Sequence, residues 1–130
     1  MPKEACKATV RRLWDEAFNQ GNMALMDEIC HARHVTHDPG VPEVPHGPDG
    51  LRQVLATYRR ALDGAQVQLE DLFGQEGKVV ARWSADSTAA RAGRALTGLS
   101  VFRFEGDQII ETWSRCEALM LTTSLEPLVS

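Results

Sequence analysis

Residues 97–117, TGLSVFRFEGDQIIETWSRCE, have the pattern of a β-hairpin, and this stretch decides the fold. Two runs of strand-forming residues, 99–104 and 108–113, flank a polar turn at 105–107 whose residue chemistry suits a short hairpin connection. We expect the hairpin to form the centre of a curved antiparallel sheet. Because side chains alternate along a strand, Trp113 and the carboxylate four residues later are predicted to share one face.

That carboxylate, Glu117, is the leading catalytic candidate in the sequence. A carboxylate beside an indole in a partly dry pocket has a raised pKa, because burial disfavours its charged form. Such a group can exchange protons near neutral pH and act as a general acid or base. We therefore expect Glu117 to face a pocket next to Trp113.

The composition predicts one compact domain spanning residues 1–130. A chain of 130 residues that is 43% hydrophobic is long enough for one core and too short for two ordinary domains. The formal net charge of −4 comes without a basic stripe, which argues against a nucleic-acid partner. Three cysteines without metal-ligand spacing favour a reducing cytoplasm, and no apolar run approaches the roughly 20 residues of a membrane span.

Three amphipathic helices are predicted in the first half of the chain. Apolar residues recur at spacings of three and four over residues 3–20, 22–30 and 49–62. Gly21 and Gly64 follow the first and third helix as terminators, and Asn22 is suited to cap the second. Between the last two helices we expect a short strand near residues 31–37. An irregular loop rich in Pro and Gly should follow it, of the kind that often rims a pocket.

After residue 64 the apolar period changes to two, which predicts strands over residues 67–73 and 78–88. Helices followed by a meander of strands indicate an α+β domain, an antiparallel sheet with helices packed on one side. Both faces of the hairpin strands carry apolar residues, Leu99 and Val101 on one and Phe102 and Phe104 on the other. We therefore expect a second subunit to cover the outer face, giving a homodimer.

Five segments together resemble the SnoaL-like polyketide cyclase family, which belongs to the nuclear-transport-factor-2-like group with ketosteroid isomerase and limonene epoxide hydrolase. In order, they are FNQGN at 18–22, THDPG at 36–40, GPDGLRQVL at 47–55, KVVARWSADST at 78–88 and TGLSVFRFEGDQIIETW at 97–113. The resemblance covers roughly residues 10–120. It implies a cone-shaped, strongly bent sheet and three helices that enclose a deep apolar pocket, usually in a homodimer assembled through the sheet.

The resemblance also implies a reaction. In cyclases of this type a carboxylate four residues after the Trp of the last strand acts as acid/base in an intramolecular aldol ring closure, without metal or cofactor. This chain has Glu117 where the family usually has Asp, and the extra methylene moves the carboxyl group by roughly one C–C bond length. The family's pocket histidine falls on His37, beside Asp38. A histidine that often follows the Trp of the middle strand is replaced here by residues 87–91, STAAR, so the standard anthracycline-type cyclase is not implied.

The predicted site therefore has two catalytic residues, Glu117 and His37, and a set of substrate-binding residues. Asp38, which precedes a proline, also suits a turn acceptor, and the aromatic residues also suit a core. Arg103 is preferred over Arg82 as a group that holds an anion or enolate. The spacing of His31, His34 and His37 does not predict a metal site, because the exit from the helix breaks their common face. The predicted substrate-binding residues are Trp14, Phe18, Asp38, Tyr58, Trp83, Val101, Arg103 and Trp113.

We interpret the chain as a cofactor-independent enzyme that closes a ring in an apolar, polyketide-like small molecule by proton transfer. Glu117 would move the proton, and His37 would polarise a carbonyl or shuttle a proton. One alternative is an epoxide hydrolase of the limonene type, in which Arg82 or Arg103 with a nearby carboxylate would position a water molecule. Another is a non-catalytic binding module, because a fold does not fix a function.

Overall fold

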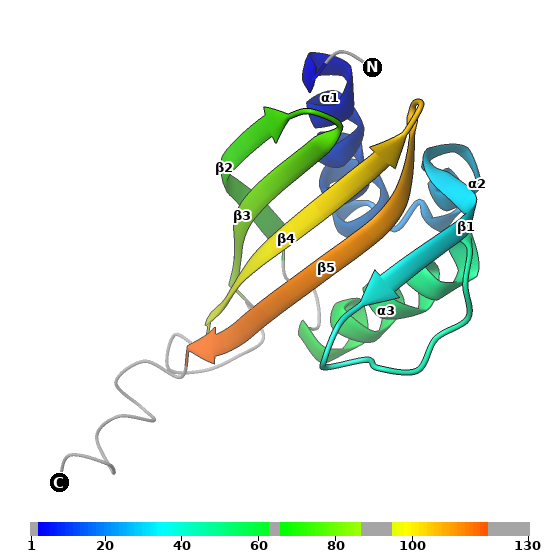
Figure 1. Cartoon of the computed structure of the whole chain (residues 1–130). Helices are drawn as coiled ribbons and strands as arrows, with labels where there is room; N and C mark the ends of the chain where they lie inside the picture. The colour runs from blue at the N-terminus through cyan, green and yellow to red at the C-terminus, as the bar shows by residue number, and fades with distance from the viewer. Residues whose placement is uncertain (1–2, 63–65, 87–94, 120–130) are drawn as a thin grey trace, which may run out of the picture.

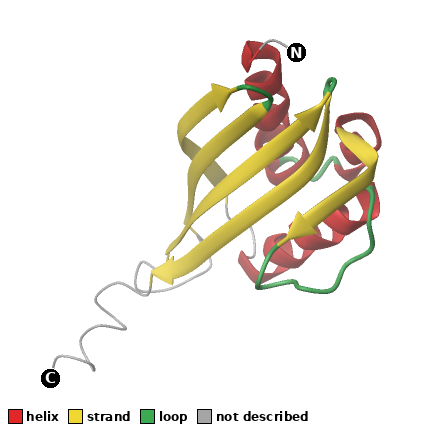
Figure 2. Ribbon diagram, in the orientation of Figure 1, coloured by secondary structure: helices red, strands yellow, loops and turns green. Residues whose placement is uncertain are grey.

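The computed structural model describes residues 3–62, 66–86 and 95–119, which form an α+β fold (Figure 1). Three helical segments lie behind a curved, unclosed five-stranded sheet (Figure 2). The elements, in chain order, are α1 (Lys3–Arg12), η1 (Leu13–Asn19), η2 (Met23–Leu25), α2 (Met26–Ile29), β1 (Cys30–His37), α3 (Pro48–Leu62), β2 (Gln66–Gln75), β3 (Lys78–Asp86), β4 (Ala95–Glu105) and β5 (Gln108–Leu119).

The predicted fold class and three helices are confirmed, with differences at the helix ends. The first predicted helix is present as α1 followed directly by the π-helical segment η1. The buried residues of the two segments lie on the side that faces the core. The second is a short 3₁₀ turn followed by α2, and Cys30, predicted on its apolar stripe, is instead the first residue of β1. None of the helices in the described ranges is long and apolar enough to cross a membrane. Gly64 lies outside those ranges.

The sheet has the strand order β1-β5-β4-β3-β2. Strands β2 to β5 form an antiparallel meander, as the sequence predicts. Strand β1 instead pairs with β5 in parallel, from Cys30 opposite Ile109 to His37 opposite Trp113. Strand β5 continues to Leu119, so its last residues extend past the end of β1 (Figure 1).

Two irregularities in register change the faces that simple alternation predicts. In β5, Arg103 pairs with Glu111 but Phe104 pairs with Ile109, which inserts an extra residue. Ile109 is therefore fully buried on the inner face, whereas strict alternation along the strand would place it on the face of Glu111. In β2, a similar shift after Leu69 turns Phe73 outward, where it is 63% exposed rather than part of the core.

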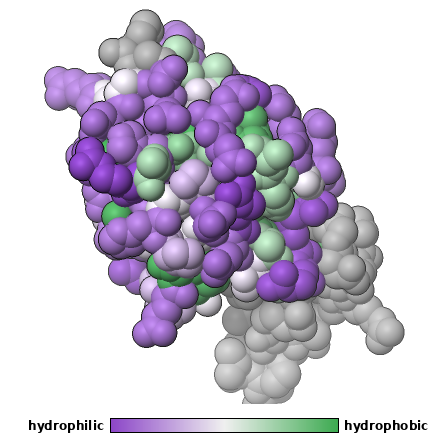
Figure 3. Space-filling view, turned by 90° about the vertical axis from the view of Figure 1, so that its right-hand side faces the viewer, coloured by the Kyte–Doolittle hydropathy of each residue, from purple (hydrophilic) through white to green (hydrophobic). Residues whose placement is uncertain are grey.

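The core lies between the inner face of the sheet and the apolar sides of the helices. The apolar period of two predicted from the sequence is seen in β3, where Val79, Ala81, Trp83 and Ala85 share one face and are all buried. The side of the molecule formed by β1, α2 and α3 is mostly hydrophilic with small hydrophobic patches (Figure 3). The outer face of the sheet exposes Leu99 and Trp113, where the predicted second subunit would bind; the homodimer stays a prediction.

Trp83 packs across the sheet over Gly98, its partner on β4. A Cβ atom at Gly98 would lie 2.1 Å from Cζ2 of the Trp83 ring, far inside contact distance. The absence of a side chain on β4 thus makes room for the indole, whose Nε1 donates a hydrogen bond of 3.1 Å to Ser100 Oγ. Trp83 is held in one position by backbone below it and a hydroxyl beside it.

His34 connects β1 to β5 inside the core. Its ring is fully buried and its Nε2 lies 2.8 Å from Thr112 Oγ1, while Nδ1 has no hydrogen-bond partner in the described part of the chain. Burial lowers the pKa of His34 to about 4, because desolvation disfavours the imidazolium. The neutral ring is the form that the folded protein holds.

The contact between Gly98 and Trp83 predicts that adding a single methyl group at position 98 destabilises the fold. Gly98→Ala should lower the free energy of unfolding by about 1–3 kcal/mol, because the ring must move from its place in the core. Urea unfolding followed by tryptophan fluorescence would measure this. Leu99→Ala, an exposed change one residue away, is the control and should cost much less. Equal losses in the two variants would contradict the proposed packing.

Burial of His34 predicts a loss of stability in mild acid. The unfolded chain takes up a proton near pH 6.5 and the folded chain only near pH 4, so stability is complete above about pH 6.5 and falls as the pH drops toward 4. Between pH 7.5 and 5 the loss should be about 2 kcal/mol. His34→Gln, which keeps a hydrogen-bonding group beside Thr112, should remove this part of the pH dependence in urea unfolding. An unchanged dependence would exclude His34 as its source.

Candidate functional site

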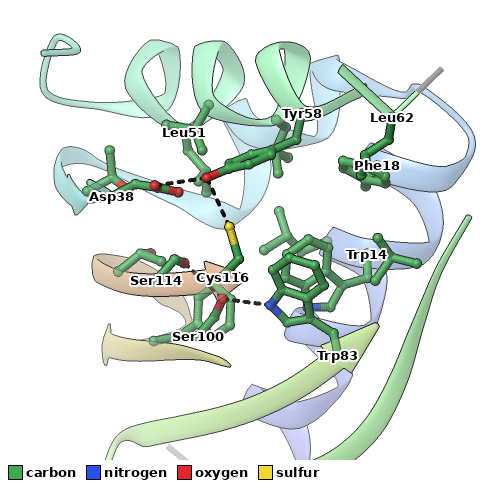
Figure 4. A pocket seen from close by; sticks show the side chains of 17 residues that line it. Trp14, Phe18, Asp38, Leu51, Tyr58, Leu62, Trp83, Ser100, Ser114 and Cys116 are labelled. Atoms are coloured by element: carbon green, nitrogen blue, oxygen red, sulfur yellow. Dashed lines mark hydrogen bonds between the residues drawn. The ribbon is translucent and has the colours of Figure 1, made fainter. Parts of the chain in front are cut away.

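An internal cavity of about 30 Å³ lies between the inner face of the sheet and the helices η1 and α3 (Figure 4). This volume is about that of a single water molecule. Its apolar wall is supplied by Trp14 and Phe18 of η1, by the buried side of α3 and by Trp83. Polar side chains enter from β1 and the residue after it, and from α3, β4 and β5, namely Thr36, Asp38, Tyr58, Ser100, Thr112, Ser114 and Cys116.

Asp38, Tyr58 and Cys116 form a hydrogen-bonded chain at one end of the cavity. Tyr58 points from α3 toward the other two residues (Figure 4), with its Oη 3.0 Å from Asp38 Oδ1 and 3.4 Å from Cys116 Sγ. Since the carboxylate only accepts, the tyrosine hydroxyl donates to Asp38, and the thiol then donates to the tyrosine oxygen. The chain is therefore directed from the thiol through the phenol to the carboxylate.

The carboxylate of Asp38 is held by one of its two oxygens. Asp38 is 6% exposed, and its Oδ1 accepts from both Tyr58 and the backbone N–H of Gly40, the latter at 2.8 Å. Within the described residues no hydrogen bond reaches Oδ2. The predicted role of Asp38 as a turn acceptor is thus correct for one oxygen, while the other is open to a ligand.

Tyr58 is held in its neutral form. Burial, the thiol of Cys116 and the charge of Asp38 all raise its pKa above the usual value. A phenol that keeps its proton is a hydrogen-bond donor over the whole neutral range. Tyr58 therefore donates to whichever oxygen beside it carries negative charge.

A second polar group of the cavity is supplied by β4 and β5. Ser100 Oγ accepts from Trp83 and lies 2.8 Å from Ser114 Oγ (Figure 4). Trp14 is also buried, and its indole Nε1 has no hydrogen-bond partner in the described part of the chain. The Trp14 and Trp83 rings are 5.3 Å apart between centroids and tilted by 42°. This part of the cavity is thus mainly an aromatic wall with two hydroxyl groups.

The predicted residues divide between the two faces of the sheet. Five of them line the cavity, as expected: Trp14, Phe18, Asp38, Tyr58 and Trp83. The expectation that Glu117, His37, Val101, Arg103 and Trp113 face the cavity is wrong. Glu117 is exposed, and alternation along β5 places it with Trp113 on the outer face. Residues 87–91, predicted to lack the family's second histidine, lie outside the described ranges.

His37 and Arg103 belong to a polar network on the outer face. His37 Nε2 lies 2.7 Å from Glu111 Oε2, and Arg103 donates to the other oxygen of Glu111 at 2.8 Å through its terminal nitrogen. These two contacts, Arg103 first, lower the pKa of Glu111. The His37 ring stacks on Trp113 with centroids 5.5 Å apart and an interplanar angle of 17°. Arg82, the weaker candidate, pairs with Asp71.

Cys116, Ser100 and Ser114 line the cavity although the sequence did not predict them as site residues. The alternation of Thr112, Ser114 and Cys116 along β5 was visible, and in the structure Thr112 pairs with the buried Phe102 of β4. A small polar residue opposite a core phenylalanine, followed by Ser114 and Cys116 on the same face, was the available signal. The pairing of Trp113 with a carboxylate four residues later was the stronger signal, and it pointed to the opposite face of the sheet.

Comparisons with known proteins identify the class. The sequence matches the SnoaL-like domain family over residues 10–112. The chain therefore belongs to the SnoaL-like family of the nuclear-transport-factor-2-like group, and the resemblance inferred from the sequence is confirmed. No curated protein sequence matches the chain.

Solved structures of this fold show the same architecture at low identity. A protein from Acidithiobacillus ferrooxidans, described as a proposed polyketide cyclase, superposes with a TM-score of 0.78 at 20% identity, covering 95% of each chain. IdmH of Streptomyces antibioticus, also described as a proposed polyketide cyclase, gives 0.71 at 22%, covering 96% of this chain and 99% of its own. A proposed ketosteroid isomerase from Kribbella flavida gives 0.69 at 12%, covering 86% and 77%. At these identities the likeness shows the fold alone.

The positions of the three cysteines predict which of them reacts in the folded protein. Cys116 is half-buried on the cavity wall, while Cys6 and Cys30 are buried and burial raises the pKa of both thiols, that of Cys30 to about 12. Iodoacetamide should therefore alkylate Cys116 at least ~10-fold faster than the other two, as peptide mass spectrometry would show. Cys116→Ser should remove the fast reaction. Fast alkylation of Cys30 would contradict the burial of its side chain.

Proposed function

We propose that the protein is a cofactor-independent cyclase or isomerase that removes and returns a proton beside a ketone, with Asp38 as the base. The observation that carries the proposal is the asymmetric anchoring of Asp38, with two donors on Oδ1 and none on Oδ2 in the described residues. A base must be fixed in place and keep one oxygen free for the proton it takes.

Tyr58 supplies the second requirement of this chemistry, a donor for the negative charge that develops on the ketone oxygen. While Asp38 is ionised, the tyrosine hydroxyl donates to it. Once Asp38 has taken the substrate proton, it is neutral and accepts this hydrogen bond less strongly. The Tyr58 hydroxyl is then able to donate to the enolate oxygen. The enolate is then poised to attack a second carbonyl of the same molecule, which closes a ring, or to take its proton back at another carbon.

The size of the cavity limits which part of a substrate reacts there. About 30 Å³ does not hold a polycyclic molecule, since ligand pockets usually measure about 300–1,000 Å³. We propose that only the reacting end of the substrate enters beside Asp38. The aromatic and aliphatic wall around it excludes water and favours an apolar, polyketide-like ligand.

The two alternatives predicted from the sequence are less well supported. An epoxide hydrolase of the limonene type would need an arginine among its cavity carboxylates. Arg82 and Arg103 both pair with carboxylates on the outer face, and neither lines the cavity. A binding module would have a wholly apolar pocket with Glu117 and His37 outside it, and these two residues do lie outside the cavity. Here the cavity carries a carboxylate, a phenol, a thiol and several hydroxyl groups.

Proton exchange tests the proposal without knowledge of the natural substrate. The α-protons of 2-tetralone, a bicyclic ketone, should exchange with solvent deuterium faster with the wild-type protein than in buffer, as followed by NMR. Asp38→Asn should reduce the protein-dependent rate by at least ~10², and Tyr58→Phe by roughly tenfold or more. Incorporation of labelled solvent oxygen into an epoxide would instead support the hydrolase.

Glu117→Gln is the matched control, because it removes a carboxylate from the outer face by an equally small change. It should exchange 2-tetralone at nearly the wild-type rate. A large loss in Glu117→Gln with little loss in Asp38→Asn would return the acid/base role to Glu117 and reject the proposed site.

A further inference from the structure

The indole nitrogen of Trp14 is a hydrogen-bond donor without an acceptor at the cavity. Its Nε1 atom is buried and has no hydrogen-bond partner among the described residues. Trp14 is 6% exposed and lines the cavity beside Trp83 (Figure 4). An indole nitrogen can only donate, and a buried donor that stays unsatisfied costs free energy in the folded protein. This cost is offset when an acceptor enters the cavity.

The hydroxyl groups of Ser100 and Ser114 supply a second free donor. Ser100 Oγ accepts from Trp83, and it lies 2.8 Å from Ser114 Oγ, so one of the two hydroxyls donates to the other. The pair has two hydroxyl hydrogens, and this contact uses one of them. Within residues 3–62, 66–86 and 95–119 the remaining hydrogen meets no acceptor. Whichever serine carries it, both of them line the cavity.

These two donors fit a neutral oxygen atom that has lone pairs and no hydrogen. They lie on neighbouring side chains, because the Trp14 ring packs against Trp83, which in turn holds Ser100. No Lys or Arg is among the described residues that line the cavity, and Asp38 already brings one negative charge. A second anion would lose its hydration without gaining a cationic partner, and Asp38 would repel it. A carbonyl oxygen is an acceptor without these costs.

The donors of Trp14 and the serine pair are separate from the donor proposed for the enolate. Tyr58 donates to Asp38 at one end of the cavity, whereas the Trp14 ring lies on another side of it (Figure 4). A proton shift within one ketone places negative charge on one oxygen. A ring closure places it on two oxygens in turn, first on the enolate and then on the carbonyl that the enolate attacks. That second oxygen needs donors of its own.

We propose that Trp14 Nε1 and the Ser100–Ser114 pair form a subsite for the oxygen of the carbonyl group that the enolate attacks. This inference rests on the proposed function, in which Asp38 takes a proton from the carbon beside the first carbonyl.

The subsite acts on the second half of the ring closure. The enolate carbon forms a bond to the second carbonyl carbon, and the π electrons of that carbonyl move onto the oxygen beside Trp14. This oxygen gains a proton as Asp38 loses one, so the product is a hydroxyketone isomeric with the substrate. Since about 30 Å³ holds only one small group, the side chains of the wall have to move apart when both carbonyls enter.

The indole N–H signals in a proton–nitrogen NMR spectrum test the subsite, because the chain has only 3 tryptophans and each signal can be assigned. The ligand is the diketone 2-(3-oxobutyl)cyclohexanone, and its matched partner 2-butylcyclohexanone lacks the second carbonyl. Spectra are recorded for wild type and for Asp38→Asn, in which turnover does not consume the diketone. The diketone should move the Trp14 signal downfield, since this N–H gains an acceptor, and 2-butylcyclohexanone should move it much less.

The other two indoles are internal controls. Trp83 already donates to Ser100, and Trp113 lies on the outer face, so neither signal should separate the two ligands. Equal shifts of the Trp14 signal with both ligands overturn the proposal. A Trp14 signal that is downfield before the ligand is added and does not move indicates a bound water molecule only, which also overturns it.

Affinities for the same two ligands test the subsite in variants, by calorimetric titration. Trp14→Phe removes the N–H and keeps an aromatic ring, so it should lower the preference for the diketone over 2-butylcyclohexanone at least ~3-fold. Ser114→Ala is the matched control on the same wall. It removes one of two hydroxyls, and the hydroxyl hydrogen of Ser100 is then free, so the preference should fall by less. An unchanged preference in Trp14→Phe overturns the proposal.

The two proposals fail separately. If Asp38→Asn abolishes 2-tetralone exchange but the Trp14 signal does not distinguish the two ligands, the function stands and the subsite is rejected. If the diketone alone moves the Trp14 signal but Asp38→Asn exchanges 2-tetralone at the wild-type rate, the subsite stands as a carbonyl-binding site and the proton-transfer function is rejected.

Discussion

The close contact between Trp83 and the backbone at Gly98 is the constraint on which the inner face of the sheet depends. It lets a large indole lie against β4, and its hydrogen bond to Ser100 then fixes the ring in rotation. Trp14 packs against the same ring from η1, so the helix is positioned by contact with the sheet. The cavity is what remains between these rings and α3, and its small volume follows from how tightly they pack.

The sequence predicted the fold class, the helices and most strand positions, because apolar period and turn residues are local signals. The signal that decides which face of the sheet carries the site is not local. Alternation correctly grouped Trp113 with Glu117, but which group points inward depends on the pairing of Thr112 with Phe102 and on the extra residue in β5. Bulges of this kind leave no clear mark in one sequence. His37 and Asp38 show the limit most directly, since neighbouring strand residues point to opposite faces and only Asp38 lines the cavity.

Two neighbouring residues at the end of β1 therefore have different roles on opposite faces of the sheet. His37 completes an outer network with Glu111 and Arg103, and its ring supports Trp113. Asp38 leaves the strand and is held by Tyr58 and the N–H of Gly40 on the other side. A shift of β1 by one residue would exchange these roles, so the buried contact of His34 with Thr112, which fixes the register, also fixes the chemistry.

The parallel pairing of β1 with β5 joins the earliest strand of the chain to the latest. His34 and Thr112, which meet in the core, are 78 residues apart in sequence. On a ribosome, β1 emerges long before its partner and must remain without a sheet neighbour until almost the whole chain has been synthesised. Contacts between such distant segments slow folding, because the intervening chain has to be ordered first. The edge of β1 is thus the surface on which a nascent or truncated chain would be most exposed to aggregation or to binding by chaperones.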